Sequence, residues 1–329
     1  MQEYIAVIGA GSWGTALANL LADNGHNIVL YAKEKEIVDS INENNENIIY
    51  LKGIKLNKNI KCKSFEDLSD DHEKIVWVVP TQFTRECIEY FKDKLIGKDI
   101  IVATKGIEIK SKKFVNNIFR EYLNIEVSVI SGPSFAKEVA NRMPTAVSIG
   151  SNNLKIAGYW QKIFSNNYFR CYTTDDVIGL EVGGALKNVI AIATGISDGL
   201  GFGNNARAGI ITRGLREITR LGLKLGGKLE TFMGLAGVGD LVLTCTGELS
   251  RNRSVGIEIG KGKKINEILK GMKMVAEGVY TVKAAFELAK DLDVEMPISE
   301  EVYNIIYNDK NPLQSFKDIM ERPLKQENI

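Results

Sequence analysis

The sequence predicts an α/β protein in which a doubly wound, mostly parallel sheet is followed by an all-helical domain. A glycine-rich turn joins an apolar strand to a helix at the N-terminus, and strand-like runs then alternate with helical or irregular stretches. From about residue 178 only helical patterns remain. Because 329 residues exceed the usual size of one hydrophobic core, we expect two domains, residues 1–178 and 179–329.

The first strand, Ile5–Ile8, leads directly into the turn Gly9-Ala-Gly-Ser-Trp-Gly14 and then into a helix. Gly9 permits a tight turn, Gly11 lets backbone approach phosphates, and Gly14 lets the helix pack closely. The next strand, Asn27–Tyr31, follows after one helix length and closes a β-α-β unit. Glycines in a turn often mark only a turn. In this context they predict a Rossmann-like dinucleotide site, with the pyrophosphate at the helix N-terminus.

Later elements follow from the spacing of apolar residues. Further strands are expected over 74–79, 99–103, 127–131 and 145–149, and the Asn-rich stretch 42–59 is interpreted as a surface excursion. Beyond residue 178, helices are expected over 181–199, 207–225, 251–261, 265–270, 281–292 and 299–307. The long first helix of this set is expected to join the two domains, because no Pro-, Gly- or Ser-rich linker separates them.

Composition excludes several classes of function. Lys and Arg number 42 against 41 Asp and Glu, a formal charge of +1, so no nucleic-acid partner is expected. The longest apolar runs are shorter than the ~18 residues that span a bilayer, and no cleavable leader is evident. The chain is therefore predicted to be cytoplasmic and not inserted in a membrane. With four scattered cysteines and two histidines, no metal site is expected.

Polar residues follow three predicted strands at the edge where ligands bind in open α/β sheets. Strand 74–79 is followed by Pro80-Thr-Gln82, strand 99–103 by Thr104-Lys105, and strand 127–131 by Gly132-Pro-Ser134. Any one of these three segments could be an ordinary turn at the start of a loop. Three consecutive strand ends that open into one crevice favour a binding site containing a lysine, hydroxyls and backbone amides.

Lys187 is the best candidate for proton transfer. His26 lies at the wrong end of the sheet, and His72 lies in an acidic turn. Lys187 is the only cation on the small, apolar segment 181–194, and Gly183 and Gly184 on its helical face suit the close approach of a ligand. Burial should lower its pKa toward values useful for catalysis. The alternative is a lysine whose ammonium extends into water.

A candidate anion site lies further along the chain. Ser250 can cap a helix that begins with Arg251, so free amides, the helix dipole and a guanidinium converge there. A solvated basic helix start is the alternative, although cations are disfavoured at a helix N-terminus unless an anion offsets them. Upstream, Asp240 follows a glycine hinge and could orient Lys187 or accept substrate hydroxyls. It could equally be a plain turn residue.

These residues fall within eight motifs that, in this order, resemble bacterial-type NAD(P)-dependent glycerol-3-phosphate dehydrogenases over nearly the whole chain. The motifs are Gly9–Ala18, Lys105–Glu108, Ser131–Val139, Gly184–Val189, Thr212–Leu215, Gly237–Leu241, Ser250–Asn252 and Val275–Gly278. The resemblance implies reversible hydride transfer between NAD(P)H and dihydroxyacetone phosphate. The product would be sn-glycerol 3-phosphate, used in phospholipid synthesis, and the chain would form a homodimer.

The resemblance also implies roles for individual residues, with Lys187 as the catalytic acid–base group. The substrate would contact Lys105, Gly132, Ser134, Lys187, Asp240, Ser250, Arg251 and Asn252. The cofactor would contact Gly9, Gly11, Ser12, Trp13, Gly14, Lys33, Lys105, Ala136, Arg251, Val275 and Glu277.

Cofactor choice and substrate class stay open at this point. An acidic residue about 20 positions past the glycines would select NAD, but the second strand ends in Tyr31-Ala-Lys33. Lys33 could pair with a 2′-phosphate, which favours NADPH with NADH tolerated, although Glu34 is adjacent. A related β-hydroxy acid dehydrogenase would share the two-domain plan but bind a carboxylate. A non-catalytic nucleotide sensor would need the glycine turn alone.

Overall fold

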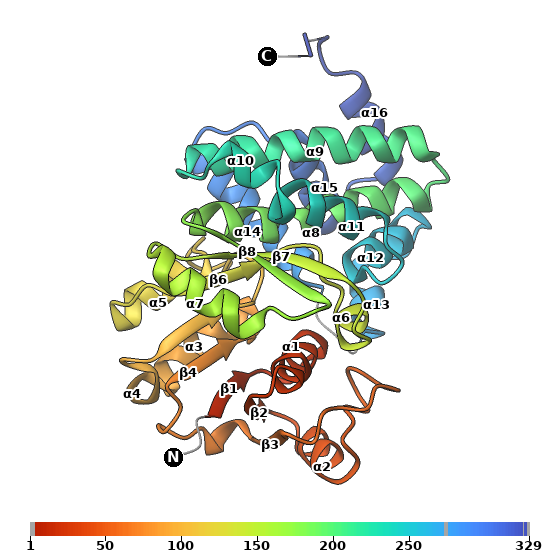
Figure 1. Cartoon of the computed structure of the whole chain (residues 1–329). Helices are drawn as coiled ribbons and strands as arrows, with labels where there is room; N and C mark the ends of the chain where they lie inside the picture. The colour runs from red at the N-terminus through yellow and green to blue at the C-terminus, as the bar shows by residue number, and fades with distance from the viewer. Residues whose placement is uncertain (1–3, 273–275, 325, 328–329) are drawn as a thin grey trace.

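The computed structural model describes residues 4–272, 276–324 and 326–327 (Figure 1). One eight-stranded sheet has the order β3-β2-β1-β4-β5-β6-β7-β8. Its neighbours are parallel except for the antiparallel pair β6 and β7. The strands are β1 (Tyr4–Ile8), β2 (Asn27–Ala32), β3 (Ile60–Ser64), β4 (Lys74–Trp77), β5 (Asp99–Val102), β6 (Ser128–Ser131), β7 (Thr145–Gly150) and β8 (Phe169–Thr174). The predicted α/β fold class with a doubly wound sheet is confirmed.

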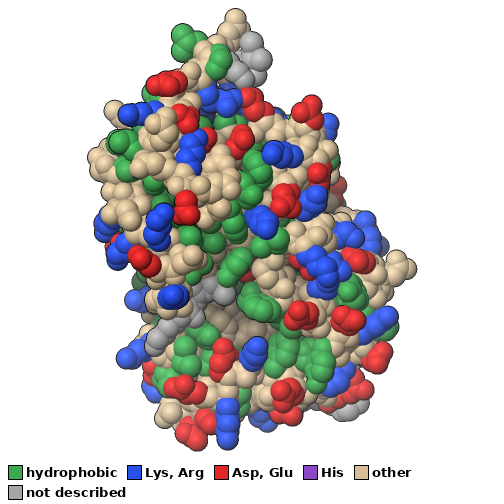
Figure 2. Space-filling view, turned by 180° about the vertical axis from the view of Figure 1, so that it is seen from behind, with side chains coloured by type: hydrophobic (Ala, Val, Ile, Leu, Met, Phe, Trp, Pro, Cys, Tyr) green, Lys and Arg blue, Asp and Glu red, His purple; other side chains and the backbone are tan. Residues whose placement is uncertain are grey.

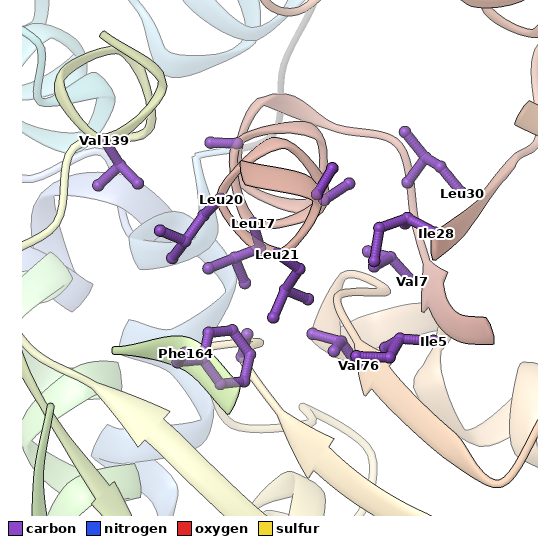
Figure 3. Packing of buried hydrophobic residues seen from close by; sticks show 14 of the residues in the cluster. Ile5, Val7, Leu17, Leu20, Leu21, Ile28, Leu30, Val76, Val139 and Phe164 are labelled. Carbon is purple, nitrogen blue, oxygen red and sulfur yellow. The ribbon is translucent and has the colours of Figure 1, made fainter. Parts of the chain in front are cut away.

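Helices cover both faces of the sheet. They are α1 (Ser12–Asp23), α2 (Lys35–Asn44), α3 (Thr81–Tyr90), α4 (Lys92–Leu95), α5 (Val115–Leu123), α6 (Ala136–Ala140) and α7 (Leu154–Phe164), with a short 3-10 turn η1 (Phe65–Asp67). Because side chains alternate along a strand, Val7 packs toward α1 and α7 while Ile8 packs toward α3 and α5. Figure 3 shows Leu17 and Leu21 of α1 and Phe164 of α7 gathered over the first of these faces.

The rest of the chain is helical and lies beside the sheet (Figure 1). The elements are α8 (Val177–Gly199), α9 (Asn204–Lys224), α10 (Leu229–Phe232), a π-helical turn η2 (Leu235–Gly239), α11 (Asp240–Thr246), α12 (Arg251–Gly260), α13 (Ile265–Lys270), α14 (Glu277–Asp291), α15 (Pro297–Tyr307) and α16 (Pro312–Met320). Nearly all of α8 is buried, and helices α9, α11, α12, α14 and α15 pack around it.

Close backbone contact fixes α12 against α8. A Cβ atom added at Gly195 of α8 would lie 2.1 Å from the carbonyl oxygen of Arg253, and one at Gly256 of α12 would lie 2.2 Å from that of Ile192. Gly199 and Gly260 repeat this arrangement one turn later. The four glycines therefore let the two helix backbones touch, which sets where the N-terminus of α12 lies relative to Lys187 on α8.

The structure differs from the sequence prediction at the sheet edges, in the stretch 42–59 and in helices α10, α11 and α16, which were not predicted. Strands β3 and β8, absent from the prediction, extend the sheet at its two edges. The stretch 42–59 is only in part a surface excursion, because Asn47 is fully buried and Leu51, Ile54 and Leu56 join the core beneath α1. Widely spaced apolar residues among asparagines gave no periodic signal by which this packing could be predicted.

Two described segments, Val177–Gly199 and Leu229–Thr246, are long and apolar enough to cross a membrane by length and composition alone. In the first, 94% of the apolar window is buried inside the protein, as expected for the central helix of a core. The second is divided between α10, η2 and α11. Figure 2 shows basic and acidic side chains interspersed on one face of the molecule.

Candidate active site

Two lysines from different parts of the chain share one buried carboxylate. Lys187 Nζ on α8 donates to Asp240 Oδ1 at 2.5 Å, and Lys105 Nζ, just after β5, donates to Asp240 Oδ2 at 2.9 Å. The Asp240 side chain is fully buried, and the side chains of Lys187 and Lys105 are 9% and 17% exposed. Two ammonium groups and one carboxylate leave the cluster with a surplus positive charge.

Glycines on α8 make this cluster possible. A Cβ atom at Gly183 would lie 2.5 Å from the carbonyl oxygen of Ala236, in the turn that leads into Asp240. A Cβ atom at Gly184 would lie 2.8 Å from Ser131 Oγ and 3.4 Å from Lys105 Cγ. The expectation that these glycines admit a ligand is therefore wrong, because protein atoms from η2 and from the end of the sheet fill the space.

Burial decides the protonation behaviour of Lys187. Removal from water lowers the pKa of its ammonium group, the charge of Asp240 opposes that shift, and the charge of Lys105 adds to it. The alternative of an ammonium extended into water does not hold, since the side chain is buried and paired. A lysine with a lowered pKa can give up and recover a proton near neutral pH.

The end of β6 supplies a second wall of the site. The carbonyl oxygen of Gly132 accepts hydrogen bonds from Lys105 Nζ at 3.3 Å and Ser134 Oγ at 2.9 Å. Gly132 has φ +149°, and a Cβ atom there would lie 2.9 Å from Val147 Cα, so no larger residue fits. The structure thus brings Lys105, Gly132 and Ser134 together beside Lys187.

At the N-terminus of α12 the two arginines have different surroundings. Ser250 Oγ accepts from the Arg253 amide at 3.3 Å and caps the helix, as predicted. The Arg253 guanidinium binds Asp198, its Nε lying 2.9 Å from Oδ2. The Arg251 side chain is exposed and makes no hydrogen bond or ion pair with the described residues. Of the two, Arg251 is the one able to hold an anion.

The Asn252 side chain makes hydrogen bonds to two other helices of the protein. Its Nδ2 donates to Asn188 Oδ1 on α8 at 2.9 Å, and its Oδ1 accepts from the Gly278 amide on α14 at 3.0 Å. The side chain therefore ties three helices together. What it offers a ligand is chiefly its backbone amide in the first turn of α12.

The glycine turn has the geometry that a pyrophosphate requires. Gly9 adopts φ +112°, and its amide donates to the Tyr31 carbonyl at 3.0 Å. A Cβ atom at Gly14 would lie 1.8 Å from the Gly9 carbonyl oxygen, so the helix packs directly on the turn. At Gly11 a Cβ atom would meet no described atom within 4 Å. The open face at Gly11, with the N-terminus of α1 behind it, fits an anionic diphosphate.

The remaining predicted cofactor residues are Ser12, Trp13, Lys33, Ala136, Val275 and Glu277. Ser12 and Trp13 open α1, Ala136 opens α6, and Lys33 is exposed just beyond the end of β2. Val275 lies outside the described residues.

Glu277 begins α14. Its Oε1 accepts from the Thr81 amide at 3.2 Å, whereas its buried Oε2 has no partner among the described residues. Burial raises the pKa of Glu277 to about 7. The unpaired oxygen lies close to Gly106 and can accept a hydrogen bond from a bound group.

Sequence reasoning missed the residues that support the site. Thr244 Oγ1 donates to the carbonyl oxygen of Asp240 at 2.6 Å, one turn along α11. Gln82 holds the loop after Lys105, donating to the Ile107 carbonyl at 2.9 Å and accepting from the Ile109 amide at 3.1 Å. The polar strand end Pro80-Thr-Gln82 was noticed, but its sequence does not reveal which loop it contacts. Among the described residues, no group of three His, Cys, Asp or Glu side chains could hold a metal ion.

The fold and the site together define a dehydrogenase that uses a nicotinamide dinucleotide. Residues 4–157 match the model of the NAD-dependent glycerol-3-phosphate dehydrogenase N-terminus, and residues 176–317 match that of the C-terminus. The chain therefore belongs to the NAD-dependent glycerol-3-phosphate dehydrogenase family. The predicted family, oxidoreductase class and nicotinamide cofactor are confirmed.

Individual relatives agree with this assignment. The chain is 50% identical to a glycerol-3-phosphate dehydrogenase (NAD(P)+) of Citrifermentans bemidjiense, with 100% of both chains covered. A solved structure of glycerol-3-phosphate dehydrogenase from Coxiella burnetii is 40% identical, with a TM-score of 0.93 and coverage of 98% of this chain and 99% of that one. A D-mandelate dehydrogenase structure, 12% identical with a TM-score of 0.62 and coverage of 95% and 99%, shares the fold alone.

Proposed function

We propose that this chain catalyses reversible hydride transfer between NAD(P)H and dihydroxyacetone phosphate, giving sn-glycerol 3-phosphate. The observation that best supports the proposal is the buried cluster in which Asp240 holds Lys187 and Lys105. A ketone carrying a phosphate needs a proton donor at its carbonyl oxygen and a separate anion site. Lys187 supplies the first, and the exposed Arg251 at the capped start of α12 supplies the second.

In the proposed reaction the bound cofactor delivers the hydride to the carbonyl carbon. Lys187 donates its proton to the carbonyl oxygen as negative charge develops there, and Lys105 stabilises that charge. Asp240 fixes both ammonium groups by one hydrogen bond each. The substrate would also contact Gly132, Ser134, Ser250, Arg251 and Asn252, which line the strand ends and the start of α12.

For the cofactor, the open turn at Gly11 would hold the pyrophosphate between Gly9, Gly14, Ser12 and Trp13. Lys33 would pair with a 2′-phosphate, and Glu34 beside it accepts a hydrogen bond from Tyr50 Oη at 2.9 Å. We therefore propose NADPH as the preferred cofactor, with NADH accepted. Comparing kcat/KM for the two cofactors tests this proposal. Replacing Lys33 with Ala should reduce the ratio of kcat/KM with NADPH to kcat/KM with NADH. Lys105, Ala136, Arg251, Val275 and Glu277 complete the proposed cofactor contacts.

The proposal extends to the organisation of the whole chain. Residues 1–178 would form the dinucleotide-binding domain and residues 179–329 the substrate domain, in line with the change from sheet to helix between β8 and α8. The chain would act as a cytoplasmic homodimer whose product supplies phospholipid synthesis.

The direct test is to mix the protein with dihydroxyacetone phosphate and NADPH and follow absorbance at 340 nm. Oxidation of NADPH that depends on the ketone supports the proposal, and its absence contradicts it. Inorganic phosphate should compete with the substrate. A β-hydroxy acid dehydrogenase would instead be inhibited by small carboxylates, because its substrate site would bind a carboxylate.

A further inference from the structure

The segment between α2 and β3 lies directly beneath the glycine turn, although it carries no recognised motif. Asn47 within it is fully buried, and Leu51 and Leu56 pack into the core beneath α1. A buried asparagine must satisfy both its amide nitrogen and its carbonyl oxygen to avoid a large desolvation cost. The partners of Asn47 therefore reveal what the segment holds in place.

The side-chain amide of Asn47 contacts the centre of the glycine turn. Its Nδ2 donates to the Ala10 carbonyl oxygen at 2.9 Å and to Thr15 Oγ1 at 2.9 Å. Thr15 Oγ1 donates in turn to the same Ala10 carbonyl oxygen, at 3.2 Å. The carbonyl of Ala10 is thus held from below by two donors.

Asn47 is itself fixed by its own segment. Its Oδ1 accepts from the Tyr50 amide at 3.0 Å, and its backbone carbonyl accepts from the Leu51 amide at 3.0 Å. Tyr50 Oη then donates to Glu34 just after β2. One short turn, Asn47–Leu51, therefore contacts the turn proposed for the pyrophosphate and also the end of β2, where the adenosine ribose would lie.

We propose that Asn47 is a positioning residue for the cofactor: by holding the Ala10 carbonyl, it aims the Gly11 amide at the pyrophosphate. In a trans peptide the carbonyl oxygen and the following N–H point in opposite directions, so anchoring one fixes the other. Gly11 lies on one side of this peptide, and a glycine resists its rotation least. The opposite side, at Gly11, is the open side of the turn.

The inference rests on the proposed cofactor binding, and a matched pair of variants tests it. Asn47→Ala removes both hydrogen bonds that the Asn47 amide donates, to the Ala10 carbonyl oxygen and to Thr15 Oγ1. Asn42→Ala is the control, since Asn42 lies in the same Asn-rich stretch and also makes two backbone hydrogen bonds, with Cys62 on β3 at 2.8 and 2.9 Å. Steady-state kinetics with NADPH and dihydroxyacetone phosphate should show KM for NADPH raised about tenfold in Asn47→Ala. We expect kcat at saturating NADPH and KM for the ketone within about twofold of wild type.

A second variant tests the same proposal in case Asn47→Ala does not fold. Thr15→Val keeps the shape but removes the hydroxyl that links Asn47 to Ala10, so it should also raise KM for NADPH selectively. Unchanged KM for NADPH in the folded variants, or an equal rise in Asn42→Ala, overturns the role of Asn47. Wild-type protein that fails to oxidise NADPH overturns the proposed function itself, and with it this inference.

Discussion

At Asp240 one buried carboxylate faces two ammonium groups, so the site holds more positive than negative charge before any ligand arrives. An unbalanced charge in a buried site is costly. It can be relieved by loss of the Lys187 proton, which the lowered pKa of Lys187 favours, or by the arrival of an anion. In the proposed reaction, the same imbalance would attract a phosphorylated ketone and favour proton transfer by Lys187.

Replacing Lys187 with Ala should abolish turnover while leaving cofactor binding intact. General acid catalysis of this kind contributes about 100- to 10,000-fold, so kcat should fall by that factor. The measurements are kcat at 340 nm and NADPH affinity by nucleotide fluorescence. Lys105 still neutralises Asp240 in this variant, which should preserve the fold. A near-normal kcat would rule out the assigned role.

Replacing Arg251 with Ala should raise KM for the phosphorylated ketone by about 10- to 100-fold, the effect of one lost charged hydrogen-bond donor. Arg253→Ala is the matched control, because that neighbouring guanidinium is bound to Asp198. Arg253→Ala should reduce thermal stability, and it should change KM for the ketone far less than Arg251→Ala does. If both variants show the same KM for the ketone as wild type, the phosphate is bound elsewhere.

Glu181, on the first turns of α8, should make stability depend on pH. Its Oε1 accepts from the Asn116 amide at 2.9 Å and its buried Oε2 has no partner among the described residues. Burial raises the pKa of Glu181 from its ordinary value of 4.5 to about 7, so the folded state binds the proton more tightly than the unfolded state. This contribution is fully present below the unfolded pKa and is lost as pH rises through the folded one, by about 3 kcal/mol.

Glu181→Gln keeps the acceptor and removes the titration. Urea unfolding at pH 5 and pH 8 should show wild type losing stability relative to this variant as pH rises. A constant difference between the two proteins across that range would contradict the prediction.

The sequence predicted candidate site residues but left most of their partners open. Lys187 stood out as the only cation on an apolar helix, and Arg251 as a cation at a helix start. The sequence allowed Asp240, 53 positions beyond Lys187, to orient that lysine, and the structure confirms the contact. Nothing local indicated that Asp240 would also hold Lys105, or that Arg253 would be paired while Arg251 is not. Such contacts depend on how helices pack, which residue types and spacing do not encode directly.

Among the elements, the α8–α12 contact does most to place the substrate site. Carbonyl oxygens of Ile192 and Arg253 lie against glycines of the opposite helix, so neither helix can be shifted without losing contact. Because α12 carries Arg251 at its first position and α8 carries Lys187, this contact sets the distance between the proposed anion site and the proposed proton donor.

Replacing Gly256 with Ala should therefore reduce both stability and substrate affinity. The added methyl would lie 2.2 Å from the Ile192 carbonyl oxygen, so α12 must move, at about 1–3 kcal/mol. Gly158→Ala is the control, since a Cβ atom there on α7 meets no described atom within 4 Å and should stabilise the helix by about 0.5–1 kcal/mol. Thermal unfolding and KM for the ketone are measured for both variants. Equal melting temperatures would contradict the close contact.

The elements differ in how readily sequence reveals them. The glycine turn and six strands were predicted because apolar, β-branched runs end at clear breaks. Edge strands β3 and β8 were missed because each exposes polar side chains on one face, such as Lys61 and Arg170. Short helices α10 and α11 were missed because their 4 and 7 residues are too few for a 3.6-residue period to show.

Over the whole molecule, α8 belongs to two hydrophobic cores. Val177 and Leu180 on its first turn pack with Trp77 and other residues on one face of the sheet, while Val182 and Leu186 pack with the surrounding helices. The Lys105–Asp240 ion pair joins the same two regions at the site. Neither core is complete without this helix, so we expect the two predicted domains to unfold together.

The chain offers a direct way to measure this coupling. All three tryptophans, Trp13, Trp77 and Trp160, lie in the sheet region, whereas far-ultraviolet circular dichroism at 222 nm is dominated by the helices of residues 177–320. Tryptophan fluorescence and circular dichroism should therefore give the same denaturation midpoint, and NADPH bound to the sheet region should raise both equally. If fluorescence changes at a lower denaturant concentration than ellipticity, α8 does not couple the two cores, and the shared site forms by docking of independently stable domains.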